Sequence, residues 1–148
     1  MAVKLGKIVQ GGNEDAVYSR YLPDSITPIQ EGLVVMTGPT EDSVAAYSGA
    51  GKSAYGVAGV SQIPSVAVVK KGICYVQADA GISASGLRLN GTQKEAYVTA
   101  DGKVTDNNSS GVAIGVFEED APHNDGEITR GTGAPATNAK CVLVQVRL

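Results

Sequence analysis

The stretch CVLVQVRL, residues 141–148, decides the fold class because its residues alternate in character along its whole length. Successive side chains of a β-strand point to opposite faces of a sheet, so residues two apart share a face. The even-numbered residues are all apolar, and the odd-numbered ones are mixed: Cys141, Leu143, Gln145 and Arg147. The pattern predicts a final strand that closes the core with its apolar face and is not a loose tail.

The stretch GVAIGVFEE, residues 111–119, predicts a second strand, one that is covered on both sides. Alternation places one apolar set on the first face, Val112, Ile114 and Val116. The other face then carries Ala113, Gly115 and Phe117. Strands buried on both faces are central strands of a sheet, so we expect this one to have a neighbour on each edge.

The rest of the chain supports an all-β fold of short strands. Nineteen Gly and six Pro interrupt the sequence too often for long helices. Further short strands are predicted at Leu33–Met36, Tyr55–Val60, Val66–Val69 and Ile73–Val76. In YVTADGKVT, residues 97–105, Asp101 and Gly102 predict a type I′ hairpin turn with positive φ at both positions. We expect a compact β-barrel or β-sandwich.

The first 31 residues differ from the remainder and predict an extended N-terminal arm. Pro23, Pro28 and the Gly11–Gly12 pair interrupt any regular period there. Asn13 is a suitable N-cap for a short helix that would end before Pro23. The predicted organisation is therefore an arm over residues 1–31 and a β-rich domain over residues 32–148.

Composition excludes several classes of partner. The net charge of −3 comes from 15 acidic and 12 basic residues spread along the chain, without a basic cluster that would neutralise phosphates. We therefore expect no nucleic acid partner. No apolar run approaches the about 18 residues that cross a bilayer, so no membrane partner is expected either. With no Trp and one Phe, the core is built mostly from Val and Ala, and assembly with other chains would add stability.

The residues that most enzymes need for catalysis are sparse. GAGKS, residues 49–53, lacks the first glycine of a phosphate-binding loop, because Ala46 stands in its place. Asp120, His123 and Asp125 share one Gly-rich acidic loop, residues 118–140, and are poorly preorganised as metal ligands. His123 is the only histidine, so a serine or cysteine nucleophile has few possible bases. We expect no enzyme activity, no cofactor and no metal.

The two cysteines, Cys74 and Cys141, stand 67 residues apart without the close spacing of zinc-binding motifs. We expect both thiols to be reduced packing residues. A disulfide between them stays open as an alternative if their strands are neighbours.

Four stretches in a fixed order resemble the capsid cement proteins of tailed phages, which are small β-rich proteins that bind the outside of an assembled head. They are VKKGICYVQADAGISASG (69–86), YVTADGKVT (97–105), SSGVAIGVFEED (109–120) and CVLVQVRL (141–148). The resemblance covers roughly residues 66–148, with 32–62 matching more loosely. Residues 1–31 and 118–140 depart from the compact pattern of the family.

The resemblance implies a structural virion protein made in the host cytoplasm and located on the capsid exterior. It would bind the major capsid protein and stabilise the lattice by bridging neighbouring capsomers, as a homo-oligomer, with a trimer favoured and a dimer possible. Apolar residues of the arm are the expected partner contacts because they lie outside the periodic pattern of the core. They are Leu5, Ile8, Tyr18, Tyr21 and Leu22.

Two other readings of the sequence stay open. In the first, the chain is a β-rich ligand-binding or host-attachment module on the virion, in which loops 49–53 and 118–140 hold a glycan or receptor. The absence of Trp argues against it, because glycan sites usually present exposed aromatic rings. In the second, the chain is an enzyme in which a metal or cofactor replaces the missing catalytic residues.

Overall fold

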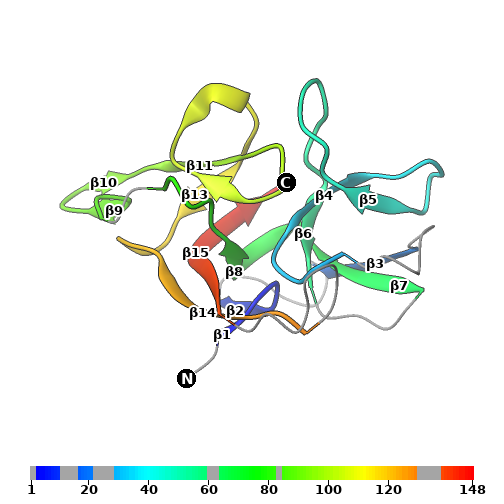
Figure 1. Ribbon diagram of the computed structural model, residues 1–148, viewed down its shortest axis with the longest axis horizontal. Helices are drawn as coiled ribbons and strands as arrows, with labels where there is room; N and C mark the ends of the chain where they lie inside the picture. The colour runs from blue at the N-terminus through cyan, green and yellow to red at the C-terminus, as the bar shows by residue number, and fades with distance from the viewer. Residues whose placement is uncertain (1–2, 11–16, 22–28, 60–63, 83–84, 130–137) are drawn as a thin grey trace.

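The protein is nearly all β, as the sequence predicts. The computed structural model describes residues 3–10, 17–21, 29–59, 64–82, 85–129 and 138–148. Within these ranges there is no α-helix, and a 3-10 turn, η2 (Asn108–Ser110), lies between two strands. None of the helical structure described is long and apolar enough to cross a membrane. Figure 1 shows two groups of strands side by side, with a small hairpin projecting from one end.

The larger sheet has eight strands and is built around the C-terminal strand. Its members are β1 (Val3–Lys4), β2 (Ile8–Gln10), β8 (Lys71–Gln77), β11 (Glu95–Val98), β12 (Val104–Thr105), β13 (Ala113–Phe117), β14 (His123–Glu127) and β15 (Ala139–Arg147). Strand β15 pairs with β8 along its length, and its other edge pairs first with β14 and then with β13. The predicted closing strand is therefore the centre of the sheet.

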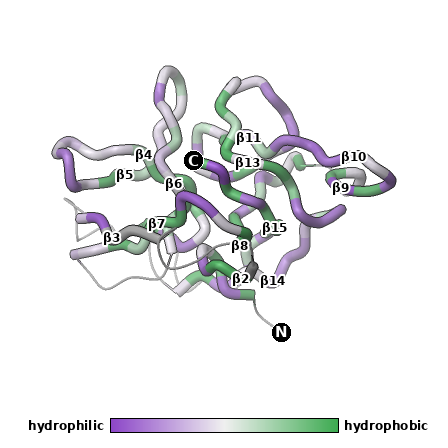
Figure 2. Tube along the Cα trace, turned by 180° about the vertical axis from the view of Figure 1, so that it is seen from behind, coloured by the Kyte–Doolittle hydropathy of each residue, from purple (hydrophilic) through white to green (hydrophobic). Residues whose placement is uncertain are grey.

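This sheet curls, so that β12 at one of its ends approaches the segment that follows β8. Ala78, just after β8, forms a bridge with Val104 of β12, and the Asp79 amide donates to the Val104 carbonyl at 2.8 Å. The largest apolar cluster fills the curl, and it includes Cys74, Phe117 and the even-numbered valines of β15. Figure 2 shows apolar residues along β8, β13 and β15 and more polar residues along the projecting loops.

A bulge in β13 changes the predicted assignment of faces. Ala96 of β11 pairs with Gly115 and Tyr97 with Ala113, so Ile114 is an extra residue in the ladder. The extra residue shifts the alternation, and Ile114 and Phe117 are both fully buried in the same cluster. The strand is central, as predicted, but placing Ile114 and Phe117 on opposite faces was wrong.

The second sheet has five strands in the order β3-β7-β6-β4-β5. They are β3 (Val17–Tyr21), β4 (Val34–Thr37), β5 (Val44–Ala46), β6 (Gly56–Ala58) and β7 (Ser65–Val69). Its two edges approach each other at one point, where the Tyr21 amide donates to the Asp42 carbonyl at 3.0 Å. Lys70 alone separates β7 from β8, so the chain passes directly from this sheet to the larger one.

The described N-terminal strands are paired within the two sheets. Strand β1 pairs with β14, β2 pairs with β8, and β3 pairs with β7, so both sheets contain N-terminal strands. Leu5 is 1% exposed and forms a third apolar cluster with Ile128 and Cys141. The premise that Leu5 lies outside the core was therefore wrong. The predicted helix was also wrong over 17–21, and its remaining residues lie outside the described ranges.

The hairpin turn predicted at Asp101–Gly102 is of another type than expected. At residues 99–103 only Gly102 has positive φ, and its amide donates to the Thr99 carbonyl at 3.0 Å. This is a three-residue loop with a left-handed glycine, not the predicted type I′ turn. The type I′ turn lies instead at Asn90–Gly91, with φ of 53° and 83°, between β9 (Arg88–Leu89) and β10 (Thr92–Gln93).

The predicted loop over residues 118–140 contains a strand. His123–Glu127 forms β14, which pairs with both β1 and β15. His123 therefore lies on a β-strand. Its predicted place in a loop was wrong.

Candidate functional site

The register of β14 against β15 collects ionisable side chains on one face of the larger sheet. His123 lies directly opposite Cys141, and Asp125 shares the His123 face because it is two residues along the strand. Tyr75 of β8 belongs to the same face, since it pairs with Leu143 of β15. The even-numbered valines of β15 point the other way, into the large core.

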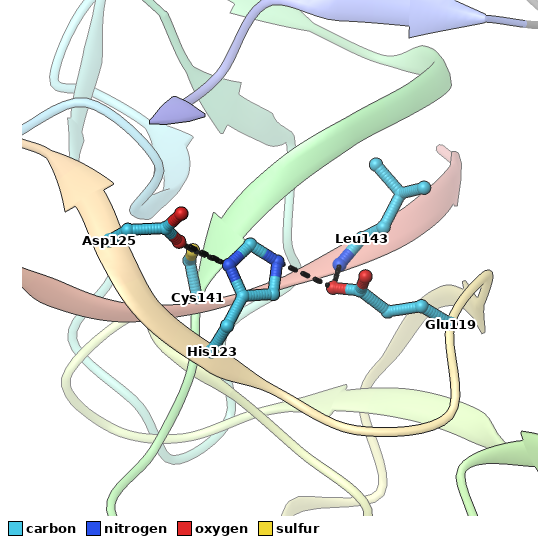
Figure 3. A network of polar contacts seen from close by, with 5 residues as sticks. All are labelled: Glu119, His123, Asp125, Cys141 and Leu143. Carbon is cyan, nitrogen blue, oxygen red and sulfur yellow. Dashed lines mark hydrogen bonds and ion pairs between the residues drawn. The ribbon is translucent and has the colours of Figure 1, made fainter. Parts of the chain in front are cut away.

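His123 is held between two carboxylates. Its Nδ1 atom contacts Asp125 Oδ1, and its Nε2 atom lies 3.0 Å from Glu119 Oε1. The same Glu119 oxygen accepts a hydrogen bond from the Leu143 amide at 2.8 Å, which fixes the carboxylate to the sheet. The Tyr75 ring meets the imidazole edge-on, with centroids 5.2 Å apart and planes at 83°. Figure 3 shows the imidazole between Asp125 and Glu119, with Cys141 close to the Asp125 carboxylate.

Cys141 completes the cluster. Its Sγ atom is 3.7 Å from His123 Nδ1 and 4.0 Å from Asp125 Oδ1. One ligand atom each from His123, Asp125 and Cys141 lies within 4.8 Å of the other two. Among the residues the structure describes, this is the group with the composition of a metal site.

The electrostatics keep Cys141 protonated in the absence of a cation. Burial, together with the nearby charges of Asp125 and Glu119, raises the pKa of its thiol to about 12. The hydrogen bond from His123 lowers the pKa of Asp125. A thiol with so high a pKa is a poor nucleophile at neutral pH, although it stands beside a histidine.

Access to the cluster differs from one member to the next. The side chains of Asp125 and His123 are 43% and 32% exposed, whereas Cys141 is fully buried beneath Leu5 and Ile128. A small ion arriving from solvent therefore meets the carboxylate and the imidazole first and the sulfur last.

Sequence reasoning found two of these residues and missed the others. The candidate set of Asp120, His123 and Asp125 is not assembled, because Asp120 Oδ1 accepts from the Gly86 amide at 2.7 Å instead. Cys141 lies 16 and 18 residues from its two partners and joins them only through strand pairing. The one available indication was its place on the mixed face of β15.

The predicted partner contacts are scattered in the fold. Leu5 is buried, Ile8 packs partly buried against the large core, and Tyr21 is 43% exposed. Leu22 and the side chain of Tyr18 lie outside the described residues. Among the residues whose side chains the structure describes, the other large exposed apolar ones are Val9, which is 54% exposed, and Leu89, which is 56% exposed.

A shallow groove of about 470 Å³ lies between the loop at 47–51 and the segment at 98–112. Part of the GAGKS stretch forms one wall, where Gly49 and Gly51 have positive φ, and η2 forms the other. Its lining consists of small apolar and hydroxyl side chains, and Tyr47, the aromatic residue among them, is buried. The stretch is a turn and not a phosphate-binding loop before a helix.

No protein-family model matches the chain, and searches of curated proteins and of solved structures also give no match.

Proposed function

We propose that this chain is a structural virion protein that binds the outer surface of a phage capsid and bridges neighbouring capsomers. The observation that carries the proposal is the exposure of Leu89 on the projecting β9–β10 hairpin. Burial of this side chain against a partner would remove apolar surface from water and so favour binding.

The hairpin suits this role because its backbone is constrained before binding. Leu89 pairs with Thr92 across the Asn90–Gly91 turn, and both turn residues already have the positive φ that a type I′ turn requires. Ordering a flexible loop costs free energy on association, and a preformed hairpin avoids much of that cost. Tyr21 and Val9 offer two further apolar contacts on β3 and β2.

A role without catalysis fits the chemistry of the described residues. The buried thiol of Cys141, with a pKa near 12, lacks the thiolate that cysteine catalysis needs. None of the residues that line the groove beside residues 47–51 is an acid, a histidine or a cysteine. The described surface therefore favours binding over covalent chemistry.

The mechanism proposed is stabilisation by mass action. A ligand that binds only the mature lattice stabilises each site by about 2.7 kcal/mol when its concentration is 100 times Kd. Attachment as a homo-oligomer, for which we favour a trimer, multiplies weak contacts without a large interface on any one subunit.

The test is co-sedimentation of the purified protein with expanded phage heads that lack it, together with thermal disruption of the same heads. We expect saturable binding and a higher disruption temperature. Leu89→Ser should weaken binding at least tenfold, whereas Asp101→Ser, an exposed change in the other hairpin loop, should leave it unchanged. Failure of the unmodified protein to bind, or equal binding by both variants, would contradict the proposal.

The groove supports a second candidate, a ligand-binding or host-attachment module. Its volume and its hydroxyl groups from Thr99, Thr105, Ser109 and Ser110 suit a small polar ligand. The burial of Tyr47 counts against a glycan, because no exposed ring lines the groove. Binding of the isolated protein on a glycan array, abolished by Ala100→Trp in the groove, would favour this candidate.

A further inference from the structure

We propose that His123, Asp125 and Cys141 bind a single Zn²⁺ ion. The cluster plays no part in the capsid-binding role, and the inference does not depend on that role. It rests on the positions of three ligand atoms and on the carboxylate that orients the imidazole.

The distance between the sulfur and the imidazole nitrogen matches tetrahedral zinc. With Zn–S near 2.3 Å and Zn–N near 2.0–2.1 Å, a tetrahedral site separates sulfur from nitrogen by about 3.6 Å. Cys141 Sγ lies 3.7 Å from His123 Nδ1 and 4.0 Å from Asp125 Oδ1. Asp125 contacts Nδ1 directly, so its partly exposed side chain must move away from the imidazole for an ion to bind between them.

Glu119 supplies the contact that zinc-binding histidines usually make with their second nitrogen. It lies 3.0 Å from Nε2 and is itself fixed by the Leu143 amide. When the Nε2 proton points to Glu119, the lone pair of Nδ1 points toward Asp125 and Cys141. Carboxylates in this position set the tautomer and raise the basicity of the ligating nitrogen.

The ligand types select the metal. A thiolate and an imidazole beside one carboxylate favour Zn²⁺ over Mg²⁺ and Ca²⁺, which prefer oxygen. Binding of the ion releases protons to solvent. The Cys141 thiol loses its proton, and Nδ1 of His123 also loses one when it is protonated before the ion binds. The fourth position faces the exposed side of the cluster, where water completes a three-ligand site.

An ion pair between His123 and Asp125 is the competing explanation. It accounts for the contact between those two residues, and Cys141 would then be a small apolar residue packed against Leu5 and Ile128. The two explanations differ in one measurable respect, because the ion pair gives the sulfur no role in metal binding.

The experiment titrates Zn²⁺ into the full chain after chelator treatment and dialysis, with calorimetry for affinity and elemental analysis for stoichiometry. We expect one ion per chain, and no binding of Mg²⁺ at the same concentration. Asp125→Asn and Cys141→Ser should each weaken binding at least 100-fold, and Glu119→Gln by about 10- to 100-fold. Asp120→Asn is the matched control, because it makes the same chemical change five residues away and should leave the affinity unchanged.

Binding of Co²⁺ provides a spectroscopic readout of the sulfur. A thiolate-to-cobalt charge-transfer band should appear in the unmodified protein and be absent in Cys141→Ser. If Cys141→Ser does not fold, the half-exposed Asp125→Asn variant decides the matter through affinity. Absence of stoichiometric Zn²⁺, or equal affinities for Asp125→Asn and Asp120→Asn, would overturn the proposal.

Discussion

The surroundings of Cys74 and Cys141 differ although the two thiols lie on neighbouring strands and are equally buried. Both are 0% exposed, and desolvation raises both pKa values to about 12. Cys74 of β8 pairs with Val144 and faces the large apolar core. Cys141 of β15 pairs with His123 and faces the opposite side of the same sheet.

This difference shows that the face of a strand, and not the degree of burial, decides what a cysteine can do. A shift of one residue in the β15 register would exchange the two faces and bring Cys141 into the valine core. Cys74 packs within the large apolar cluster, whereas Cys141 has an imidazole and a carboxylate within reach. The predictions below test how far the two regions are independent.

The largest effect is expected from deleting residues 1–22. This deletion removes β1, β2 and β3, and with them Leu5, which covers Cys141. We expect a loss of stability greater than the about 2–5 kcal/mol of a single buried Leu truncation, measured by urea unfolding. A deletion variant with an unchanged unfolding midpoint would restore the idea of a separable arm.

Single truncations should uncover one thiol at a time. Leu5→Ala removes the cover of Cys141 at a cost of about 2–5 kcal/mol, and Phe117→Ala opens the core around Cys74 at about 3–5 kcal/mol. Alkylation of the native protein, followed by peptide mass spectrometry, should be faster at Cys141 in the first variant and at Cys74 in the second. Equal acceleration of both thiols in each variant would mean that the two regions open together.

Alkaline pH should destabilise the protein through the buried thiols. The pKa of Cys74 rises from 9.0 to about 12 on folding, so above pH 9 the unfolded chain loses a proton that the folded chain keeps. Stability is therefore complete below pH 9 and falls by about 1.4 kcal/mol per pH unit for each such thiol up to pH 12. When the free energy of unfolding is measured with urea between pH 9 and 11, it should fall less steeply with pH in Cys74→Ala than in the unmodified protein. An equally steep fall in both would show that Cys74 does not resist ionisation.

The smallest effect is expected far from both thiols, at the Asn90–Gly91 turn. Gly91 has φ of 83° and open space around its Cβ position, so Gly91→Ala adds only backbone strain of about 1 kcal/mol. Gly102→Ala should cost more, because its added Cβ would lie 3.0 Å from the Val34 carbonyl oxygen. Thermal unfolding measures both losses. A lower melting temperature for Gly91→Ala than for Gly102→Ala would mean that the β9–β10 hairpin is tightly packed.

The strands with clear alternation could be predicted from the sequence. β15 could be predicted with its faces because apolar residues recur at every second position along it, whereas for β13 the apolar run predicted the strand but not its faces. The bulge at Ile114 escaped prediction because it arises from pairing with β11 and not from any local residue pattern. Asn90–Gly91 is itself a strong pattern for a type I′ turn, because Asn and Gly are the residues that most readily adopt positive φ.

The candidate site depended on information that the sequence does not display. The polar segment HNDGE forms β14 only because β1 and β15 supply partners on both edges. The N-terminal strands are similarly short, and the Gly11–Gly12 pair beside them suggested an irregular arm. Cys141 was placed on the correct face of β15, but its distance of 18 residues from His123 hid their contact.

X-ray absorption at the zinc edge tests the contrast between the two thiols most directly. With one equivalent of Zn²⁺ bound, we expect one sulfur at about 2.3 Å and nitrogen or oxygen neighbours at about 2.0–2.2 Å. The sulfur should persist in Cys74→Ala and disappear in Cys141→Ser. A zinc ion without a sulfur neighbour, or a sulfur that disappears with Cys74→Ala, would contradict the account.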